Sequence, residues 1–316
     1  MIDVSHLSKR YGNFLAVDDV SFKIEKGEVV GFLGPNGAGK STIMNILTGY
    51  LSLTQGKVEI DGYDILENPN EAKRRIGYLP EIPPLYTDMS VREYLNFIYD
   101  LKKAKFPRVP HIDEILKLVK IEDVQNKLIK SLSKGYKQRV GIAQALIGNP
   151  DVLILDEPTV GLDPKQIIEI RNLIAKLGKN HTVILSSHIL SEIQAVCERV
   201  IIINHGKLIA DSTPSELSKT LSHDHSVTVR AGGSEEEVTR ILNSVKGVKS
   251  VVCLGKKEEG SLDYAVTPED GNDIRSDIAA RLAERNKPIY MLDTNELSLE
   301  QVFIKLTYDE NASAKL

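Results

Sequence analysis

The chain has 316 residues and a formal net charge of −4, with 41% hydrophobic and 27% charged side chains. This balance is typical of a soluble globular protein of about two domains. Its apolar runs are far shorter than the roughly 18 residues of a transmembrane helix, and its first residues do not resemble a signal peptide. We therefore expect any membrane role to depend on a partner.

The charge distribution argues against a nucleic-acid partner. Residues 221–316 carry more acidic than basic side chains, whereas binding to a phosphate backbone requires clustered positive charge. The two cysteines, Cys197 and Cys253, match neither a metal motif nor a disulfide framework, as expected in a reducing cytosol. The sequence therefore predicts a cytosolic protein that does not bind nucleic acid.

Strand patterns alternate with helical patterns through residues 1–217, which predicts an α/β domain with a mixed sheet. Three segments alternate in polarity and predict an antiparallel flank: residues 4–7, 17–24 and 58–60. Three others are almost wholly apolar, as buried parallel strands require: residues 29–33, 152–155 and 183–185. Between about residues 88 and 138 apolar positions recur at helical spacing, which predicts a helical subdomain.

A second, smaller domain is predicted after a polar linker at residues 218–225. Residues 226–316 show strand and helix patterns in the order strand, helix, strand, strand, helix, strand. This order matches a ferredoxin-like α+β sandwich. We expect the domain to be regulatory or accessory.

A phosphate-binding loop is the strongest motif. Residues 34–41 match G-x-x-x-x-G-K-[ST], directly after an apolar strand and before a helical pattern. Backbone N–H groups of such a loop converge on phosphate oxygens at a helix N-terminus, which already favours anions. This context disfavours the alternative of a chance glycine-rich turn. The predicted nucleotide-binding residues here are Gly34, Pro35, Asn36, Gly37, Ala38, Gly39, Lys40, Ser41 and Thr42.

Two carboxylates end the apolar strand at residues 152–155. Beside the phosphate loop, Asp156 would hold Mg²⁺ and Glu157 would polarise the attacking water, with Lys40 on the transferred phosphate. Alone, Asp-Glu-Pro also suits a simple chain turn. Paired with the phosphate loop, it predicts an ATPase that uses ATP and Mg²⁺.

Five further residues complete an ordered series of motifs. Tyr11 precedes the phosphate loop, Ser133 and Gly135 lie in Leu-Ser-Lys-Gly-Tyr, Asp163 follows Gly-Leu, and His188 follows Ser-Ser. Taken singly, Tyr11 is an ordinary strand aromatic, Ser133 a helix N-cap and His188 a structural histidine.

Together, these motifs make residues 1–215 resemble the ABC (ATP-binding cassette) ATPases. The resemblance implies a homodimer that encloses two ATP molecules. It implies that Tyr11 stacks on adenine, that Ser133 and Gly135 reach the nucleotide of the other subunit, and that Asp163 belongs to the D-loop. It makes His188 the switch histidine beside the catalytic site.

Within that family, the chain is similar to the ATPases of ABC-2-type exporters, particularly the gliding-motility-associated ATP-binding subunits. Five segments carry this resemblance: residues 77–81, 84–86, 89–95, 132–140 and 298–303. It implies a peripheral subunit on the cytoplasmic face of the membrane, attached to a separate permease. Residues 81–95 are the predicted docking surface, with Leu85 and Met89 as apolar contacts.

One residue departs from the family pattern. Glu81 stands where many ABC ATPases have a glutamine that binds Mg²⁺ or the attacking water. A carboxylate also suits Mg²⁺, but it adds negative charge near phosphate.

Two other functions compete with the exporter ATPase. A soluble ABC ATPase would act on a ribosome, nucleic acid or assembly complex, but such proteins often have two cassettes or a long coiled-coil insert. A pure ATP sensor would not need Glu157 and His188. We expect an exporter ATPase.

Overall fold

The computed structural model describes residues 1–187, 189–221, 226–269, 273–294, 303 and 307. It divides into two compact units, residues 1–214 with 305–316, and residues 215–304. The predicted linker at residues 218–225 begins inside helix α8 (Pro214–Leu221). The last residues, predicted to belong to the C-terminal domain, lie outside the described residues except for Thr307, whose carbonyl accepts a hydrogen bond from Asn204 of the first unit at 3.0 Å.

The first unit is built on a six-stranded sheet in the order β10-β9-β3-β8-β7-β6. Five strands are parallel and only β10 runs antiparallel, against β9. The strands are β3 (Val29–Leu33), β6 (Ile76–Leu79), β7 (Val152–Asp156), β8 (Thr182–Ser186), β9 (Arg199–Asn204) and β10 (Lys207–Ser212). Strands β7 and β8 are buried at every position, as their continuous apolar sequences predict.

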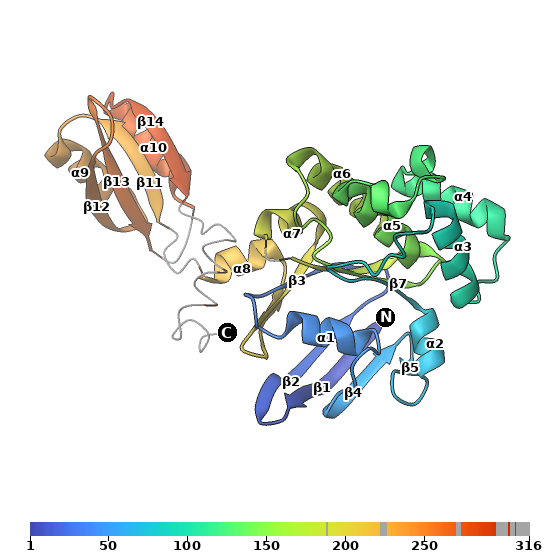
Figure 1. The fold of residues 1–316 in the computed structure, drawn as a ribbon. Helices are drawn as coiled ribbons and strands as arrows, with labels where there is room; N and C mark the ends of the chain where they lie inside the picture. The colour runs from blue at the N-terminus through green and yellow to red at the C-terminus, as the bar shows by residue number, and fades with distance from the viewer. Residues whose placement is uncertain (188, 222–225, 270–272, 295–302, 304–306, 308–316) are drawn as a thin grey trace. The chain divides into compact units, whose positions relative to one another are not determined.

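An antiparallel sheet in the order β2-β1-β4-β5 flanks this core, as the alternating segments predict. Its strands are β1 (Ile2–Tyr11), β2 (Phe14–Ile24), β4 (Gln55–Ile60) and β5 (Tyr63–Asp64). Helix α1 (Lys40–Leu47) lies between the two sheets (Figure 1). Ile43, Met44 and Leu47 of α1 share one apolar cluster with side chains of both sheets. This packing fixes the start of α1.

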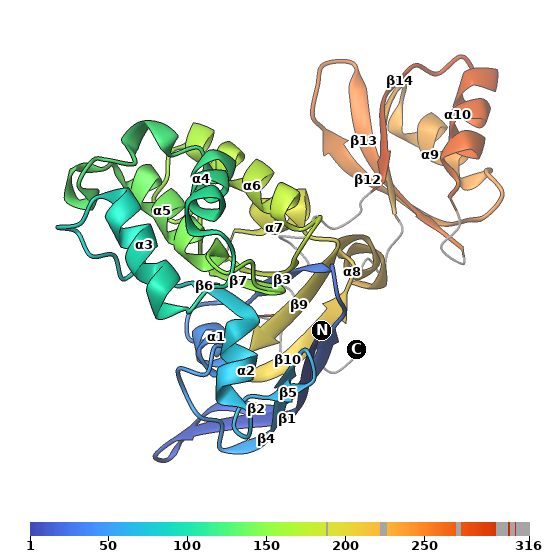
Figure 2. The same ribbon diagram turned by 90° about the vertical axis from the view of Figure 1, so that its right-hand side faces the viewer.

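Helices cover the opposite face of the six-stranded sheet (Figures 1 and 2). They are α3 (Val91–Leu101), α4 (Arg108–Val119), α5 (Lys134–Leu146), α6 (Pro164–Leu177) and α7 (Leu190–Val196), whereas the short α2 (Pro69–Arg74) precedes β6. Two 3₁₀ turns, Glu122–Val124 and Ile129–Ser131, connect α4 to α5. The helical subdomain was predicted to end near residue 138, but α5 continues to Leu146. Gly77 permits this, because a Cβ there would lie 2.3 Å from the Ala145 carbonyl oxygen.

The second unit contains an antiparallel sheet in the order β12-β13-β11-β14. Its elements follow the predicted chain order: β11 (Val227–Gly232), α9 (Glu235–Asn243), β12 (Val248–Lys256), β13 (Ser261–Pro268), α10 (Arg275–Glu284) and β14 (Ile289–Thr294). Val238 and Leu242 of α9 and Ile278 of α10 pack with Val229 and Tyr264 of the sheet. Among the described residues of both units, no helix is long and apolar enough to cross a bilayer.

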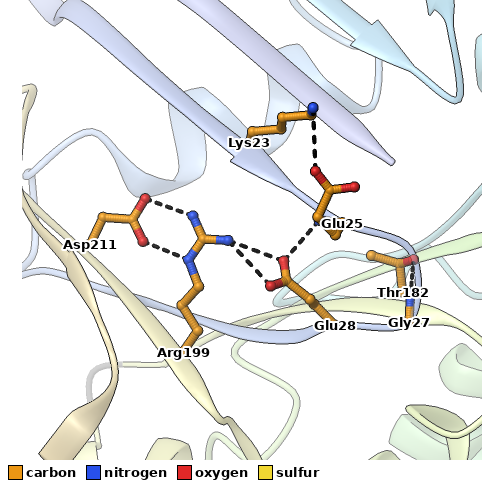
Figure 3. A network of polar contacts seen from close by, with 7 residues as sticks. All are labelled: Lys23, Glu25, Gly27, Glu28, Thr182, Arg199 and Asp211. Atoms are coloured by element: carbon orange, nitrogen blue, oxygen red, sulfur yellow. Dashed lines mark hydrogen bonds and ion pairs between the residues drawn. The ribbon is translucent and has the colours of Figure 1, made fainter. Parts of the chain in front are cut away.

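An ion-pair network ties one edge of the six-stranded sheet together (Figure 3). Arg199 of β9 donates two hydrogen bonds to Asp211 of β10, at 2.6 and 2.8 Å. It donates two more, at 3.1 and 3.4 Å, to Glu28 in the turn before β3. All three side chains are partly buried. Fork-like pairing of this kind is stronger than a single contact between exposed charges.

We predict that Arg199→Met lowers the free energy of unfolding by about 1–2 kcal/mol, because two partly buried carboxylates lose their shared partner. Lys23→Met is the control. Lys23 pairs with Glu25 at 3.3 Å in the same region, and both side chains are more than half exposed. The control should change stability by less than about 0.5 kcal/mol. Urea unfolding followed by circular dichroism measures both, and equal effects would show that the network has no special weight.

Candidate functional site

The phosphate loop connects β3 to α1 and forms one wall of a cavity of about 570 Å³. Gly39 is the N-cap of α1 at φ +107°, a left-handed conformation that favours glycine. A Cβ at Gly34 would lie 2.3 Å from the Ile203 carbonyl oxygen. The loop is also fixed by the N–H of Gly206, which bonds to the Ala38 carbonyl at 2.9 Å. The glycines are therefore required by close packing on β9 and by backbone geometry.

The start of α1 suits an anion. In this fully described segment, no side chain caps the helix. The first backbone N–H groups of a helix have no carbonyl partner within the helix. Gly37, Gly39, Ser41 and Thr42, around this helix start, line the cavity. An uncapped helix N-terminus beside a cavity is a favourable place for phosphate.

Lys40 is 7% exposed and lies inside the curve of its own loop. Its ammonium donates to the carbonyl oxygens of Gly34, at 2.5 Å, and Pro35, at 3.2 Å. Burial lowers the pKa of Lys40, while the negative charges of Glu157, Asp156 and Glu81 oppose this shift. The cation is thus held where three carboxylates act on it.

Asp156, the last residue of β7, and Glu157, which follows it, line the cavity together with Lys40. Asp156 accepts a hydrogen bond from the Ser186 hydroxyl, at 2.7 Å, at the end of the neighbouring strand β8. Burial raises the pKa of Asp156, and the nearby Glu81 raises it further, against the opposing effects of Ser186 and Lys40. Glu157 has a positive φ of 47°, and its N–H bonds to the Ser186 carbonyl at 3.1 Å.

The outer part of the cavity is aromatic. Tyr11 lines it and is 45% exposed. The Lys9 ammonium lies 5.3 Å from the centre of the Tyr11 ring. Phe14, which pairs with Tyr11 across the β1–β2 turn, also lines the cavity. Phe14 is not among the residues predicted from the sequence; its only signal is an aromatic residue three positions after Tyr11, where a hairpin reverses the chain.

The structure gathers most of the predicted residues but not all. Besides Tyr11 and Asp156, the lining includes Asn36, Gly37, Ala38, Gly39, Lys40, Ser41, Thr42, Glu81 and Glu157. Gly34 and Pro35 are not part of the lining, and their carbonyl oxygens accept hydrogen bonds from the Lys40 ammonium. His188 lies outside the described residues.

Ser133, Gly135 and Asp163 do not line the cavity within this chain. Ser133 is the N-cap of α5, as the simpler interpretation predicts, and accepts from the Tyr136 N–H at 3.4 Å. Asp163 caps α6 in the same way, through the Gln166 N–H at 2.9 Å. A Cβ on Gly135 would lie 2.7 Å from the Gln166 side chain. The starts of α5 and α6 are therefore in contact.

Comparison with known proteins identifies the family. The family described as "ABC transporter" matches residues 17–160. The bacitracin transport ATP-binding protein BcrA of Bacillus licheniformis is 42% identical over 221 residues, which cover 69% of this chain and 72% of that protein. The chain belongs to the ABC transporter family. It is an ATP-binding subunit of the ABC ATPase type, as the motifs predict.

Other ABC proteins match over different shares of the chain. The linearmycin resistance ATP-binding protein LnrL of Bacillus subtilis is 30% identical over 97% of this chain and 98% of its own length. A dimeric ATP-binding cassette, solved in a post-hydrolysis state with ADP and Pi, superposes with a TM-score of 0.61 at 28% identity. The superposed region covers 67% of this chain and 98% of the solved cassette. The α/β fold of an ABC ATPase is thereby confirmed.

We predict that Lys40→Ala abolishes tight ATP binding, because Lys40 is the cation of the phosphate loop and the carboxylates would then repel the triphosphate. Lys73→Ala is the control, since Lys73 lies beside other cavities, not this one. Calorimetric titration with ATP should show wild-type affinity for the control. Wild-type affinity in Lys40→Ala would contradict the assignment of the site.

Proposed function

We propose that this chain is the ATP-hydrolysing subunit of an ABC-2-type exporter and drives a separate permease. The observation that carries the proposal is the cavity in which the Lys40 ammonium lies among Glu157, Asp156 and Glu81. BcrA and LnrL are named for bacitracin transport and linearmycin resistance, which supports export as the direction. The narrower resemblance to gliding-motility subunits stays a prediction.

The proposed reaction is attack of water on the γ-phosphorus of ATP, which releases ADP and phosphate. The loop N–H groups and Lys40 bind the phosphates and stabilise the charge that develops in the transition state. Glu157 orients and polarises the water. The Tyr11 ring stacks on the adenine of ATP, and Phe14 lies beside Tyr11. His188 is proposed to be the switch histidine beside the catalytic site.

The donor set also fits Mg²⁺. Ser41, Asp156 and Glu81 line the cavity, and their hydroxyl and carboxylate oxygens are of the kind that Mg²⁺ prefers, a few at a time, together with waters and substrate phosphates. No group of three His, Cys, Asp or Glu side chains able to hold a metal occurs among the described residues. In the proposal, ATP phosphates and waters would complete the coordination of Mg²⁺. Mg²⁺ would neutralise phosphate charge. Asp156, which accepts a hydrogen bond from Ser186, would help to hold the ion.

We further propose that a second copy completes each site. Ser133 and Gly135 belong to the family signature but lie away from the cavity of their own chain. A homodimer would bring them onto the nucleotide of the partner, with Asp163 near the shared boundary. The related cassette with ADP and Pi is dimeric.

The second unit is proposed to be a ferredoxin-like accessory domain. The proposal is supported by its chain order, βαββαβ, and by its antiparallel sheet with the strand order β12-β13-β11-β14. The match to LnrL extends over 97% of the chain and so includes this unit. The residues that line the cavity belong to the first unit, and we propose a regulatory role or a contribution to dimer contacts for the second.

We predict that Glu157→Gln keeps ATP binding but lowers kcat by roughly 10²–10⁴, the usual cost of losing a general base. ATP-bound dimers should accumulate, because the amide cannot activate water. Phosphate release and light scattering measure the two effects. Turnover close to wild type would assign the role of base to another residue.

The permease contact is proposed at the loop before α3. Ile82 is 82% exposed and Tyr86 is 55% exposed, whereas Leu85 and Met89 are half-buried. The Tyr86 ring packs edge-on against Phe97, with centres 5.2 Å apart. Exposed apolar side chains that are held in place suit a protein partner. Ile82 and Tyr86 are therefore better contacts than the pair that the sequence suggested.

We predict that Tyr86→Asp breaks association with the membrane subunit, since a charge would be buried at the contact. Leu66→Asp is the matched control, because Leu66 is also 55% exposed. A pull-down from solubilised membranes reports association, and nucleotide titration of the isolated subunit should stay unchanged. If Tyr86→Asp retains the permease, the contact lies elsewhere. If the wild type binds no membrane protein, the soluble ABC ATPase becomes the better reading.

A further inference from the structure

A buried carboxylate that does not line the nucleotide cavity joins three segments of the chain. Glu192 of α7 is 1% exposed. Its Oε2 atom accepts hydrogen bonds from the hydroxyl of Thr159 and, at 3.1 Å, from that of Ser187. Its Oε1 atom lies 3.9 Å from Nη2 of Arg171 on α6. Thr159 follows β7, and Ser187 follows β8, so Glu192 links the ends of two adjacent strands to a helix.

This carboxylate is costly to bury. Among the described residues, its Oε1 atom has no hydrogen-bond partner, and neither has the buried Nε of Arg171. A charge with incomplete pairing destabilises the folded state relative to an apolar side chain of similar size. Core packing alone therefore does not account for Glu192. A role in holding the two hydroxyl groups does.

The segment that Glu192 holds is the one that orients Glu157. Glu157 lies two residues before Thr159 and has the uncommon left-handed φ of 47°. Such a conformation is unfavourable for a side chain other than glycine, and it persists only where neighbouring contacts fix it. The Val160 N–H bonds to the Glu157 carbonyl at 3.2 Å, which closes a tight turn around Thr159. The Thr159 hydroxyl anchors this turn to Glu192.

The second segment is anchored at the same carboxylate. The Ser187 hydroxyl, which donates to Glu192, also accepts from the Ile189 N–H at 3.0 Å. The preceding residue, Ser186, bonds to both Asp156 and Glu157 through its hydroxyl and its carbonyl. Glu192 therefore closes a ring of contacts that runs from Glu157 across to β8 and back.

We propose that Glu192 is a positioning residue for ATP hydrolysis, which holds the turn after Glu157 against the segment after β8. The inference rests on the proposed role of Glu157 as the group that polarises water. Glu192 does not line the cavity, so it acts through Thr159 and Ser187. We call the contacts of Glu192 with Thr159 and Ser187 the clamp. Loss of the clamp shifts the Glu157 carboxylate, while the phosphate loop, which is packed on β9, stays intact.

The test is a pair of isosteric variants in the full-length chain. Thr159→Val removes the hydroxyl with little change in volume, and Glu192→Gln removes the charge. Both should lower kcat by about 10- to 100-fold, the effect of misplacing a reacting group by about 1 Å. Both should leave the KM for ATP within about threefold of wild type, where loss of the whole fold would reduce binding as well. Thr159→Ser, which keeps the hydroxyl, should restore turnover.

The double variant tests whether the two groups act as one unit. Thr159→Val combined with Glu192→Gln should lower kcat no further than the more impaired single variant, because residues in one network are not additive. Glu28→Gln is the control: it weakens the contact with Arg199 in the network of Figure 3, outside the cavity. It should leave kcat unchanged even if the melting temperature falls.

The outcomes separate the two proposals. If Glu157→Gln abolishes turnover but Thr159→Val and Glu192→Gln keep the wild-type kcat, the clamp is wrong and the proposed function stands. A kcat loss in the two single variants that multiplies in the double variant also contradicts the clamp. If the wild-type chain does not hydrolyse ATP, or Glu157→Gln does so normally, the proposed function itself fails.

Discussion

The burial of one ammonium group constrains most of the nucleotide site. Lys40 is almost inaccessible to solvent, and its charge is offset by two carbonyl oxygens of its own loop and by nearby carboxylates. Removing a cation from water is expensive unless polar groups replace the water. The loop must therefore curve closely around it, and the glycines make this curve possible. The same negative surroundings would be unfavourable without the cation.

The parallel sheet explains why distant parts of the sequence meet at this cation. Strands β3, β8 and β7 are adjacent and parallel, so their carboxyl ends lie at one edge. The phosphate loop follows β3, Glu157 follows β7 and Ser187 follows β8. Ligands in open α/β sheets bind at such an edge. The position of the chemistry thus follows from strand order, and side chains such as Asp156 and Ser186 are neighbours because their strands pair.

Local sequence was sufficient to predict the parts of the site that short motifs specify. The phosphate loop, Asp156 and Glu157 each depend on a few neighbouring residues and on one apolar strand, and all of them line or support one cavity. The antiparallel flank and the βαββαβ order of the second unit were predicted for a similar reason, because polarity alternates within each strand. Glu81 was predicted to lie near phosphate and does line the cavity.

Contacts between distant segments could not be predicted in this way. Phe14 joins the cavity through a hairpin turn, and Glu192 reaches Thr159 only because β7 and β8 are neighbours. Helix α5 extends past the expected boundary since Gly77 lets it approach β6. Thr307 contacts the first unit through a hydrogen bond from Asn204, which no periodicity reveals.

The most direct test of the account is a structure of Glu157→Gln with ATP and Mg²⁺. The account predicts that the triphosphate lies along residues 34–42, with its γ-phosphate at Lys40, the base on Tyr11, and Ser133 of a second copy on the phosphate. ATP bound outside the cavity lined by Lys40 and Asp156 would contradict the account, as would a complete site formed within a single copy.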